Sequence, residues 1–130
     1  MSKVIVISGA SSGIGKEIAK FLFSQGNTVI GLSSSYPKEE YSYQYVIGDL
    51  GSCESIDNAI EEIKKLTDHI DVLINCAGIG ISGAIEYTQL AEVRKIFDVN
   101  VTGQFYITKQ LLPLIRKSDK GKIINIGSVA

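Results

Sequence analysis

Eight residues near the start of the chain, Ser8 to Gly15, have the composition of a phosphate-binding loop. Three glycines, Gly9, Gly13 and Gly15, allow the backbone to turn tightly and allow a pyrophosphate to approach it closely. The loop separates an apolar run from a helical pattern, and the start of a helix offers unpaired N–H groups and partial positive charge. The alternative is a tight turn that needs glycine only for its dihedral angles. The order of strand, loop and helix favours the binding interpretation.

Polar residues follow each of the other apolar runs as well. Ser33 and Ser34 follow the second run, Asp49 the third, the stretch 75–78 the fourth and Ser128 the fifth. In a doubly wound sheet the ligand binds at the carboxyl ends of the strands. Each residue alone has a structural alternative, such as a cap for Asp49 or an ordinary strand end for Ser128. Five strand ends that all carry ligand-contacting groups nevertheless predict one site.

The elements that must position these residues alternate between strands and helices. Continuous apolar runs predict buried strands at residues 4–7, 28–32, 43–47, 72–74 and 122–126. Helical spacing predicts helices over 56–66, 90–97 and 101–117, and a first helix after the glycine loop with an apolar face made by Ile14, Ile18, Phe21 and Leu22. Alternation of this kind predicts an α/β fold with a doubly wound parallel sheet and right-handed crossovers.

Two residues disturb the helical patterns late in the chain. Asn100 interrupts the apolar spacing, and asparagine competes with a helix for backbone hydrogen bonds, so its position requires a reason. Pro113 removes one backbone hydrogen bond from the helix 101–117 and is expected to bend it.

Composition narrows the classes of function. The chain has 130 residues and no linker, so residues 1–130 are interpreted as one domain. A net charge of −1 gives no electrostatic argument for binding nucleic acid or an anionic membrane. No apolar run approaches the roughly 18 residues of a membrane span. The two cysteines, Cys53 and Cys76, have no metal-ligand spacing, so we expect no metal site and reduced thiols in a cytoplasmic protein.

Taken in order, the motifs resemble the N-terminal half of the short-chain dehydrogenase/reductase family. The stretch Ser8 to Gly15 is similar to the TGxxxGxG cofactor loop of that family, with serine in place of threonine. Asp49 resembles the aspartate that contacts the adenine ring. Asn75 to Gly78 resembles the NNAG motif, with Cys76 in place of the second asparagine.

The resemblance implies a Rossmann-like sheet with strand order 3-2-1-4-5 that is truncated after the fifth strand. It implies an NAD(P)-dependent oxidoreductase that transfers a hydride between a nicotinamide cofactor and a carbonyl or alcohol substrate. Asn100 and Ser128 fall where the family has its active-site asparagine and its catalytic serine. The residues implied to bind the cofactor are Gly9, Ser11, Ser12, Gly13, Ile14, Gly15, Ser33, Ser34, Asp49, Leu50, Asn75, Ala77 and Gly78.

One family motif is absent from these residues. The chemistry of the family needs a tyrosine and a lysine spaced YxxxK, and none of the six tyrosines has a lysine four residues later. Three interpretations follow. The favoured one is an oxidoreductase represented by a truncated chain that binds cofactor and is inactive alone. The others are a sensor or interaction module that binds a dinucleotide without turnover, and a structural protein with a vestigial site. A YxxxK pair encoded downstream would decide for the first.

The serines after the second strand favour NADP(H) over NAD(H). An acidic residue at the position of Ser33 would bind the ribose hydroxyls and repel a 2′-phosphate. Residues 33–35 are all serines, whose hydroxyl groups can donate to a phosphate, although no arginine is present there to clamp it.

The late helix and the last strand predict association. In the family the helix corresponding to 101–117 packs against the next helix of its own chain and against a partner subunit. Without that next helix, Phe105, Leu111, Leu112 and Ile115 should leave apolar area uncovered, and the fifth strand should be an open edge. We therefore expect a homo-oligomer formed through the helix 101–117.

Overall fold

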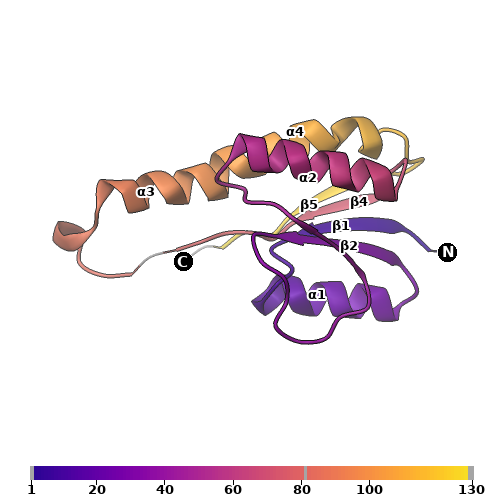
Figure 1. Ribbon diagram of the computed structural model, residues 1–130, viewed down its shortest axis with the longest axis horizontal. Coiled ribbons are helices and arrows are strands. Elements are labelled where there is room, and N and C mark those ends of the chain that lie inside the picture. Colours follow the sequence, from indigo (N-terminus) through magenta and orange to yellow (C-terminus); the bar gives the residue numbers. More distant parts are fainter. Residues whose placement is uncertain (1, 81, 129–130) are drawn as a thin grey trace.

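The computed structural model describes residues 2–80 and 82–128, which form a five-stranded parallel sheet with helices on both faces (Figure 1). The strand order is β3-β2-β1-β4-β5, which confirms the predicted α/β topology. The strands are β1 (Val4–Ser8), β2 (Thr28–Ser33), β3 (Gln44–Ile47), β4 (Val72–Asn75) and β5 (Lys122–Asn125). All five predicted strands are present, and in each of them one of the two bounds differs from the prediction by a single residue.

The central strands are buried on both faces, which explains their unbroken apolar sequences. Val6 in β1 lies opposite Ile30 in β2 and Leu73 in β4, and all three side chains are fully buried. Val, Ile and Leu are the residues typical of parallel strands that are covered on both faces. At the sheet edge, by contrast, every residue of β5 is exposed.

The helices form two layers with the sheet between them (Figure 1). α1 (Gly13–Ser24) covers one face, while α2 (Cys53–Leu66) and α4 (Gln104–Ile115) lie on the other. α2 presents its predicted apolar stripe to the core, and Ile107 and Leu111 of α4 join the same cluster. Buried residues of the stripe in α2 are Ile56, Ala59, Ile60 and Ile63.

The predicted apolar face of α1 is wrong at two positions. Ile14 and Phe21 are 65% and 61% exposed, whereas the buried residues of α1 are Gly15 and Ala19. The small residues Gly15 and Ala19 let α1 lie close to the sheet. The face of α1 that contacts the sheet is therefore centred on them and not on Ile14 and Phe21. Ile18 is half-buried and packs against the core beneath α1.

The two late helices are one continuous helical rod rather than two separated helices (Figure 1). α3 (Leu90–Phe97) passes into a π-helical segment, η2 (Asp98–Gly103), which passes directly into α4. Asn100, which was expected to break the helical pattern, lies inside η2. The wider turn of a π-helix absorbs the change of register without ending the helix. A short 3-10 turn, η1 (Ile85–Tyr87), precedes α3.

The apolar residues expected to be uncovered on the 101–117 helix divide between two environments. Phe105 is 67% exposed, whereas Leu111 and Ile115 are buried against the sheet, so the prediction was wrong for the latter two. Leu112 is half-buried. Within residues 2–80 and 82–128, none of the helices combines the length and the apolar character needed to cross a membrane.

Candidate functional site

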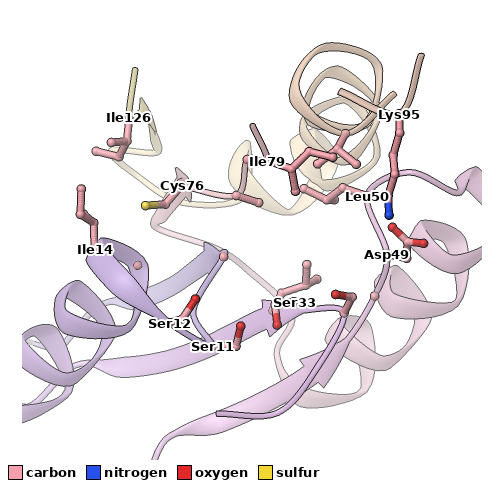
Figure 2. Close-up of a pocket in the computed structure, with 18 residues that line it drawn as sticks. Ser11, Ser12, Ile14, Ser33, Asp49, Leu50, Cys76, Ile79, Lys95 and Ile126 are labelled. Carbon is pink, nitrogen blue, oxygen red and sulfur yellow. The ribbon is translucent and has the colours of Figure 1, made fainter. Parts of the chain in front are cut away.

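A cavity of about 490 Å³ lies at the carboxyl ends of the central strands (Figure 2). This volume is within the range of about 300–1,000 Å³ that is typical of small-molecule sites. Most of the predicted cofactor residues line it. They are Gly9, Ser11, Ser12, Ile14, Gly15, Ser33, Ser34, Asp49, Leu50, Ala77 and Gly78. Figure 2 shows Ile14, Cys76 and Ile126 at one end of the cavity, and Asp49 and Lys95 at the other.

Two glycines are sterically required in the loop after β1. Gly9 has a φ of 71°, and a Cβ there would lie 2.8 Å from the backbone of Ala77. A Cβ on Gly15 would collide with the carbonyl oxygen of Gly9. The first turn of α1 therefore packs directly on the loop, and no side chain separates the backbone of either residue from the cavity.

The loop is tied to the segment after β4 by the hydroxyl of Ser8. Its oxygen accepts hydrogen bonds from the backbone N–H groups of Cys76 and Ala77, both at 3.1 Å, and the side chain is buried. Serine in place of threonine in the loop motif therefore retains a hydroxyl that holds the two segments together. These two bonds hold the glycine loop against the segment after β4, and both segments line the cavity.

The start of α1 is suited to an anion. Its N-cap residue, Ser12, makes no side-chain capping hydrogen bond, and the first turn contains no acidic residue. The first N–H groups of a helix have no partner within the helix and carry partial positive charge. Ser12, Ile14 and Gly15 at this helix start line the cavity, so the residues present fit the pyrophosphate of a dinucleotide.

The end of β2 is organised by a tyrosine that the sequence analysis did not identify. Tyr45 of β3 donates a hydrogen bond from its hydroxyl to Ser33 Oγ at 2.9 Å. Ser33 Oγ in turn donates to the carbonyl of Ser35 at 2.6 Å and accepts from its N–H at 3.2 Å. Burial raises the pKa of Tyr45, against the effect of its hydrogen bonds with Ser33 and Ser11.

These bonds change the role expected of Ser33. Its hydroxyl proton is committed to Ser35 and its lone pairs accept from Ser35 and Tyr45, so it does not donate to a ligand in this arrangement. The prediction that three hydroxyl groups are available to a 2′-phosphate is therefore wrong for Ser33. Ser34 and Ser35 are exposed, and Ser34 lines the cavity.

Asp49 closes the turn after β3 and also lines the cavity. Its Oδ1 accepts a hydrogen bond from the Gly51 N–H at 2.8 Å, which closes the turn after β3. The side chain is nevertheless exposed and lines the cavity beside Leu50. The segment η2 crosses this turn closely, because a Cβ on Gly103 would collide with the carbonyl oxygen of Leu50.

Gly13 and Asn75 were predicted to bind the cofactor but do not line this cavity. Gly13 has a φ of 58°, and a Cβ built on it meets no atom within 4 Å. Asn75 is buried, and its Nδ2 donates to Thr108 Oγ1 at 3.0 Å and to Asn125 Oδ1 at 2.9 Å. Its side chain therefore ties β4 to α4 and β5, which is the structural alternative considered for it.

Asn100 is held by a pair of backbone contacts. Its Oδ1 accepts from the Ile79 N–H and its Nδ2 donates to the Ile79 carbonyl, both at 2.8 Å. This clamp joins η2 to the segment after β4 and gives the reason for asparagine inside a helical pattern. The residue does not line the cavity, although Ile79 does.

Ser128 lies beyond the end of β5 and is exposed. It does not line the cavity, whereas Ile126 of the same segment does. The N–H of Ile126 donates to the Asn75 carbonyl at 3.0 Å, so the chain leaving β5 remains paired with β4 at this point. Most of the predicted cofactor residues therefore line the cavity, whereas neither of the two predicted catalytic residues, Asn100 and Ser128, lines it.

Seven residues line the cavity without having been predicted to bind the cofactor. Three flank predicted residues and lie at strand ends or in loops, and a fourth, Cys76, lies within the NNAG-like motif. Burial raises the pKa of the Cys76 thiol. Lys95 and Val99 come from the late helical rod, and their four-residue spacing places them on one helix face. The seven are Leu32, Gly48, Cys76, Ile79, Lys95, Val99 and Ile126.

Comparison with known proteins identifies the family. The sequence model described as short chain dehydrogenase matches residues 3–130. The chain belongs to the short-chain dehydrogenase family. Among its relatives, a 3-ketodihydrosphingosine reductase of Bacteroides thetaiotaomicron is 39% identical over 127 residues, which cover 98% of this chain and 47% of that protein.

Solved structures of short-chain dehydrogenases and related enzymes share the fold. The ligand-free aldohexose dehydrogenase of Thermoplasma acidophilum gives a TM-score of 0.90 at 38% identity, over 98% of this chain and 50% of the other. The NADP complex of RhlG from Pseudomonas aeruginosa gives 0.87 at 28%, over 98% and 55%. A short-chain dehydrogenase from Leptospira borgpetersenii with bound NAD+ gives 0.89 at 28%, over 99% and 52%.

Length separates this chain from the short-chain dehydrogenases that it matches. The chain spans about half the length of the first curated relatives and of the solved structures just described. NADP is bound in one of those structures and NAD+ in another, so both forms of the nicotinamide cofactor occur among the solved relatives.

Proposed function

We propose that this chain is the cofactor-binding part of an NAD(P)-dependent oxidoreductase and that the cavity at the carboxyl ends of the strands binds the dinucleotide. The observation that carries the proposal is the close packing of the loop and α1, where Gly9 and Gly15 leave room for no side chain. A backbone surface kept bare at a helix start is the arrangement that a pyrophosphate requires.

The polar and apolar ends of the cavity suggest how the dinucleotide lies. Asp49 and Leu50 suit the adenine ring, and Ser34 suits its ribose. The segment from Ser11 to Gly15 suits the pyrophosphate. The opposite end, lined by Cys76 and Ile126, is left for the nicotinamide.

The bound nicotinamide would exchange a hydride with a small carbonyl or alcohol substrate. Ser128 would orient the substrate oxygen, and Asn100, by clamping Ile79, would fix the wall near the reacting end. Neither side chain is an acid able to donate a proton to a developing alkoxide near pH 7. Because YxxxK is absent from these 130 residues, we expect them to bind cofactor without turnover.

The turn after β2 favours NADP(H) over NAD(H). The first carboxylate after β2 is Glu39, and its charge is paired with Lys16 at 3.1 Å. Ser34 and Ser35 are exposed and can donate hydrogen bonds to a 2′-phosphate. The preference is expected to be modest, because no arginine lies in residues 33–35 to form a bidentate contact with a phosphate.

Association through the late helical rod is part of the proposal. Phe97, Val101 and Phe105 are exposed at 59%, 57% and 67%, and they lie four residues apart on one side of the rod. A stripe of large apolar side chains of this kind marks an interaction surface, here one for a second copy of the chain. The free thiols of Cys53 and Cys76 fit a reducing compartment such as the cytoplasm.

Isothermal titration of the chain with NADPH and NADH tests cofactor binding and preference together. We expect saturable binding of both, with tighter binding of NADPH. An absence of binding at millimolar cofactor would contradict the proposal, and tighter binding of NADH would contradict only the preference.

A dinucleotide-binding sensor without catalysis is the second candidate. The observation in its favour is the absence of YxxxK from a chain whose glycine loop is intact. The two candidates differ when these residues are followed by the rest of an oxidoreductase, since only the enzyme then consumes NADPH in the presence of a ketone.

A further inference from the structure

Two opposite charges face each other at the adenosine end of the cavity. Asp49 lies in the turn after β3 and Lys95 on α3, and both line the cavity. Among the described residues that line the cavity, they are the only charged ones. Figure 2 shows Lys95 extending from α3 toward Asp49.

Neither charge is satisfied by the other. In the part of the chain that the structure describes, the Lys95 ammonium forms no ion pair within 4.0 Å and no hydrogen bond. The Asp49 side chain accepts one hydrogen bond, from the Gly51 N–H to Oδ1, and among the described residues nothing donates to its Oδ2. An ammonium donor and a carboxylate acceptor therefore face each other in the cavity without an ion pair within 4.0 Å (Figure 2).

The placement of Lys95 follows from the packing of the helical rod. Val99 is one helical turn further on, is buried and lines the same cavity. The neighbouring Arg94 carries the same charge but does not line the cavity. Because α3 itself buries none of its residues, the position of Lys95 makes no contribution to the core that would explain it.

We propose that Lys95 is a further cofactor-binding residue that donates a hydrogen bond to the adenine ring, opposite Asp49. This inference rests on the proposed function of the cavity. Adenine carries an exocyclic N6 amino group, which is a donor, next to ring nitrogens that are acceptors. Asp49 Oδ2 suits the amino group and the Lys95 ammonium suits a ring nitrogen, so one base can satisfy both unpaired charges.

The pair also predicts which base is selected. Hypoxanthine has a carbonyl oxygen in place of the N6 amino group, so an acceptor would face the acceptor Asp49. We therefore expect 5′-IMP to bind more weakly than 5′-AMP, and the difference to shrink in an Asp49→Asn variant, whose amide can donate to the carbonyl.

The test compares Lys95→Met with Arg94→Met, which removes the same charge from the neighbouring position. Equilibrium binding of 5′-AMP, nicotinamide mononucleotide and NADPH is measured for the unsubstituted chain and both variants. We expect Lys95→Met to weaken 5′-AMP and NADPH by about fivefold or more, since a hydrogen bond from a charged donor is lost. Nicotinamide mononucleotide should bind all three proteins equally, and Arg94→Met should bind every ligand as the unsubstituted chain does.

The outcomes separate this inference from the proposed function. If both variants lowered the affinity for 5′-AMP equally, the effect would come from the loss of one positive charge and not from a contact of Lys95, and the inference would be overturned. Unchanged binding by Lys95→Met would overturn it as well, while leaving the cofactor site in place. If the unsubstituted chain binds none of the ligands, the proposed function fails and the inference fails with it. Thermal unfolding of the variants should be unchanged, because α3 contains no buried residue.

Discussion

The Tyr45 hydroxyl lies 2.9 Å from Ser33 Oγ and donates a hydrogen bond to it, so a residue of β3 determines the state of the hydroxyl at the end of β2. The ring lies across β2 at Gly31, where a Cβ would approach it to 2.8 Å. A side chain outside the cavity therefore holds a residue that lines it, Ser33.

This relationship gives the first prediction, for Tyr45→Phe. Loss of the phenolic donor leaves a buried hydroxyl partly unpaired and should lower the free energy of unfolding by about 1 kcal/mol. Because the turn at Ser33 loses its bond to β3, affinity for 2′,5′-ADP should fall while affinity for nicotinamide mononucleotide stays unchanged. Tyr41→Phe is the control from the same aromatic cluster, since the Tyr41 hydroxyl makes no hydrogen bond with any residue that the structure describes. Equal loss of both ligands would contradict a positioning role.

Two glycines with positive φ, Gly13 and Gly26, allow the effect of backbone strain on stability to be distinguished from the effect of a substitution on cofactor binding. Gly13 at 58° and Gly26 at 88° both have open space where a Cβ would lie, so alanine at either site adds backbone strain of about 1–2 kcal/mol. Only Gly13 lies in the glycine loop. We therefore expect similar losses of stability from Gly13→Ala and Gly26→Ala in urea unfolding, but a loss of cofactor affinity of about tenfold from Gly13→Ala alone. Equal affinities of the two variants would contradict a pyrophosphate site at this loop.

The Asn100 clamp predicts a cost for an isosteric change. In Asn100→Asp the acceptor for the Ile79 N–H remains. The Nδ2 group that donates to the Ile79 carbonyl is replaced by a carboxylate oxygen, and this oxygen and the carbonyl oxygen repel each other. The free energy of unfolding should fall by about 1–3 kcal/mol, because a well-formed bond becomes an unfavourable contact. Asn58→Asp, at an exposed position of α2, is the control and should change stability little. Similar unfolding midpoints for the two variants in urea would be inconsistent with the clamp.

Asp71, at the amino end of β4, predicts that the protein loses stability in acid. The Ser118 hydroxyl, donating at 2.6 Å, and the Val4 N–H hold the pKa of Asp71 below its ordinary value of 3.8. A folded pKa below the unfolded one stabilises the protein above about pH 4, and this contribution is lost as the pH falls through the folded pKa. Asp71→Asn should therefore be less stable than the unsubstituted chain at neutral pH and should lose less stability between about pH 4 and pH 2.

His69, beside Asp71, provides the control with the opposite sign. Its pKa is raised from 6.5, mainly by the hydrogen bond with Asp68 at 2.9 Å. Its contribution to stability is present below about pH 6.5 and is lost as the pH rises through the folded pKa. Asp68→Asn should reduce this upper limb of the stability profile. The pKa of Asp68 is itself lowered, mainly by its hydrogen bond with His69, so this variant should also lose the part of the acid limb that Asp68 contributes. Urea unfolding over a pH series measures both limbs, and an unchanged upper limb in Asp68→Asn would contradict the assignment.

The strand ends of this protein were predictable because they are encoded locally. The apolar run before Ser8 and the glycines after it determine both the strand and the turn, and the same holds for Asp49 after β3. Parallel pairing then brings these ends to one edge of the sheet, which is why so many of the predicted residues line one cavity.

The contributions of the helical rod were not predictable in the same way. Whether Lys95 or Arg94 faces the cavity depends on the rotation of α3 and on the extra residue in the turn of η2, neither of which apolar spacing defines. Ser33 was misjudged for a related reason. Its hydroxyl is occupied by Tyr45, twelve residues away, and such a partner is visible only when β3 is paired with β2.

The last prediction is that these 130 residues do not catalyse hydride transfer at a useful rate. Cofactor binding is expected to persist, because the glycine loop and Asp49 line an intact cavity. General acid–base help is typically worth about 10²–10⁴-fold in rate, and a neutral serine such as Ser128 does not supply it near pH 7. Loss of nicotinamide positioning should cost more, since a misplacement of about 1 Å can reduce a rate by about 10²-fold.

NADPH absorbance, followed with a panel of ketones and alcohols under conditions in which titration shows cofactor bound, measures this rate. We expect no consumption above the rate without protein. Turnover that disappears in Ser128→Ala would contradict the prediction, because it would require a proton donor other than the tyrosine of YxxxK. The donor would then have to be sought near Cys76, whose raised thiol pKa keeps its proton at neutral pH and which lies at the end of the cavity left for the nicotinamide.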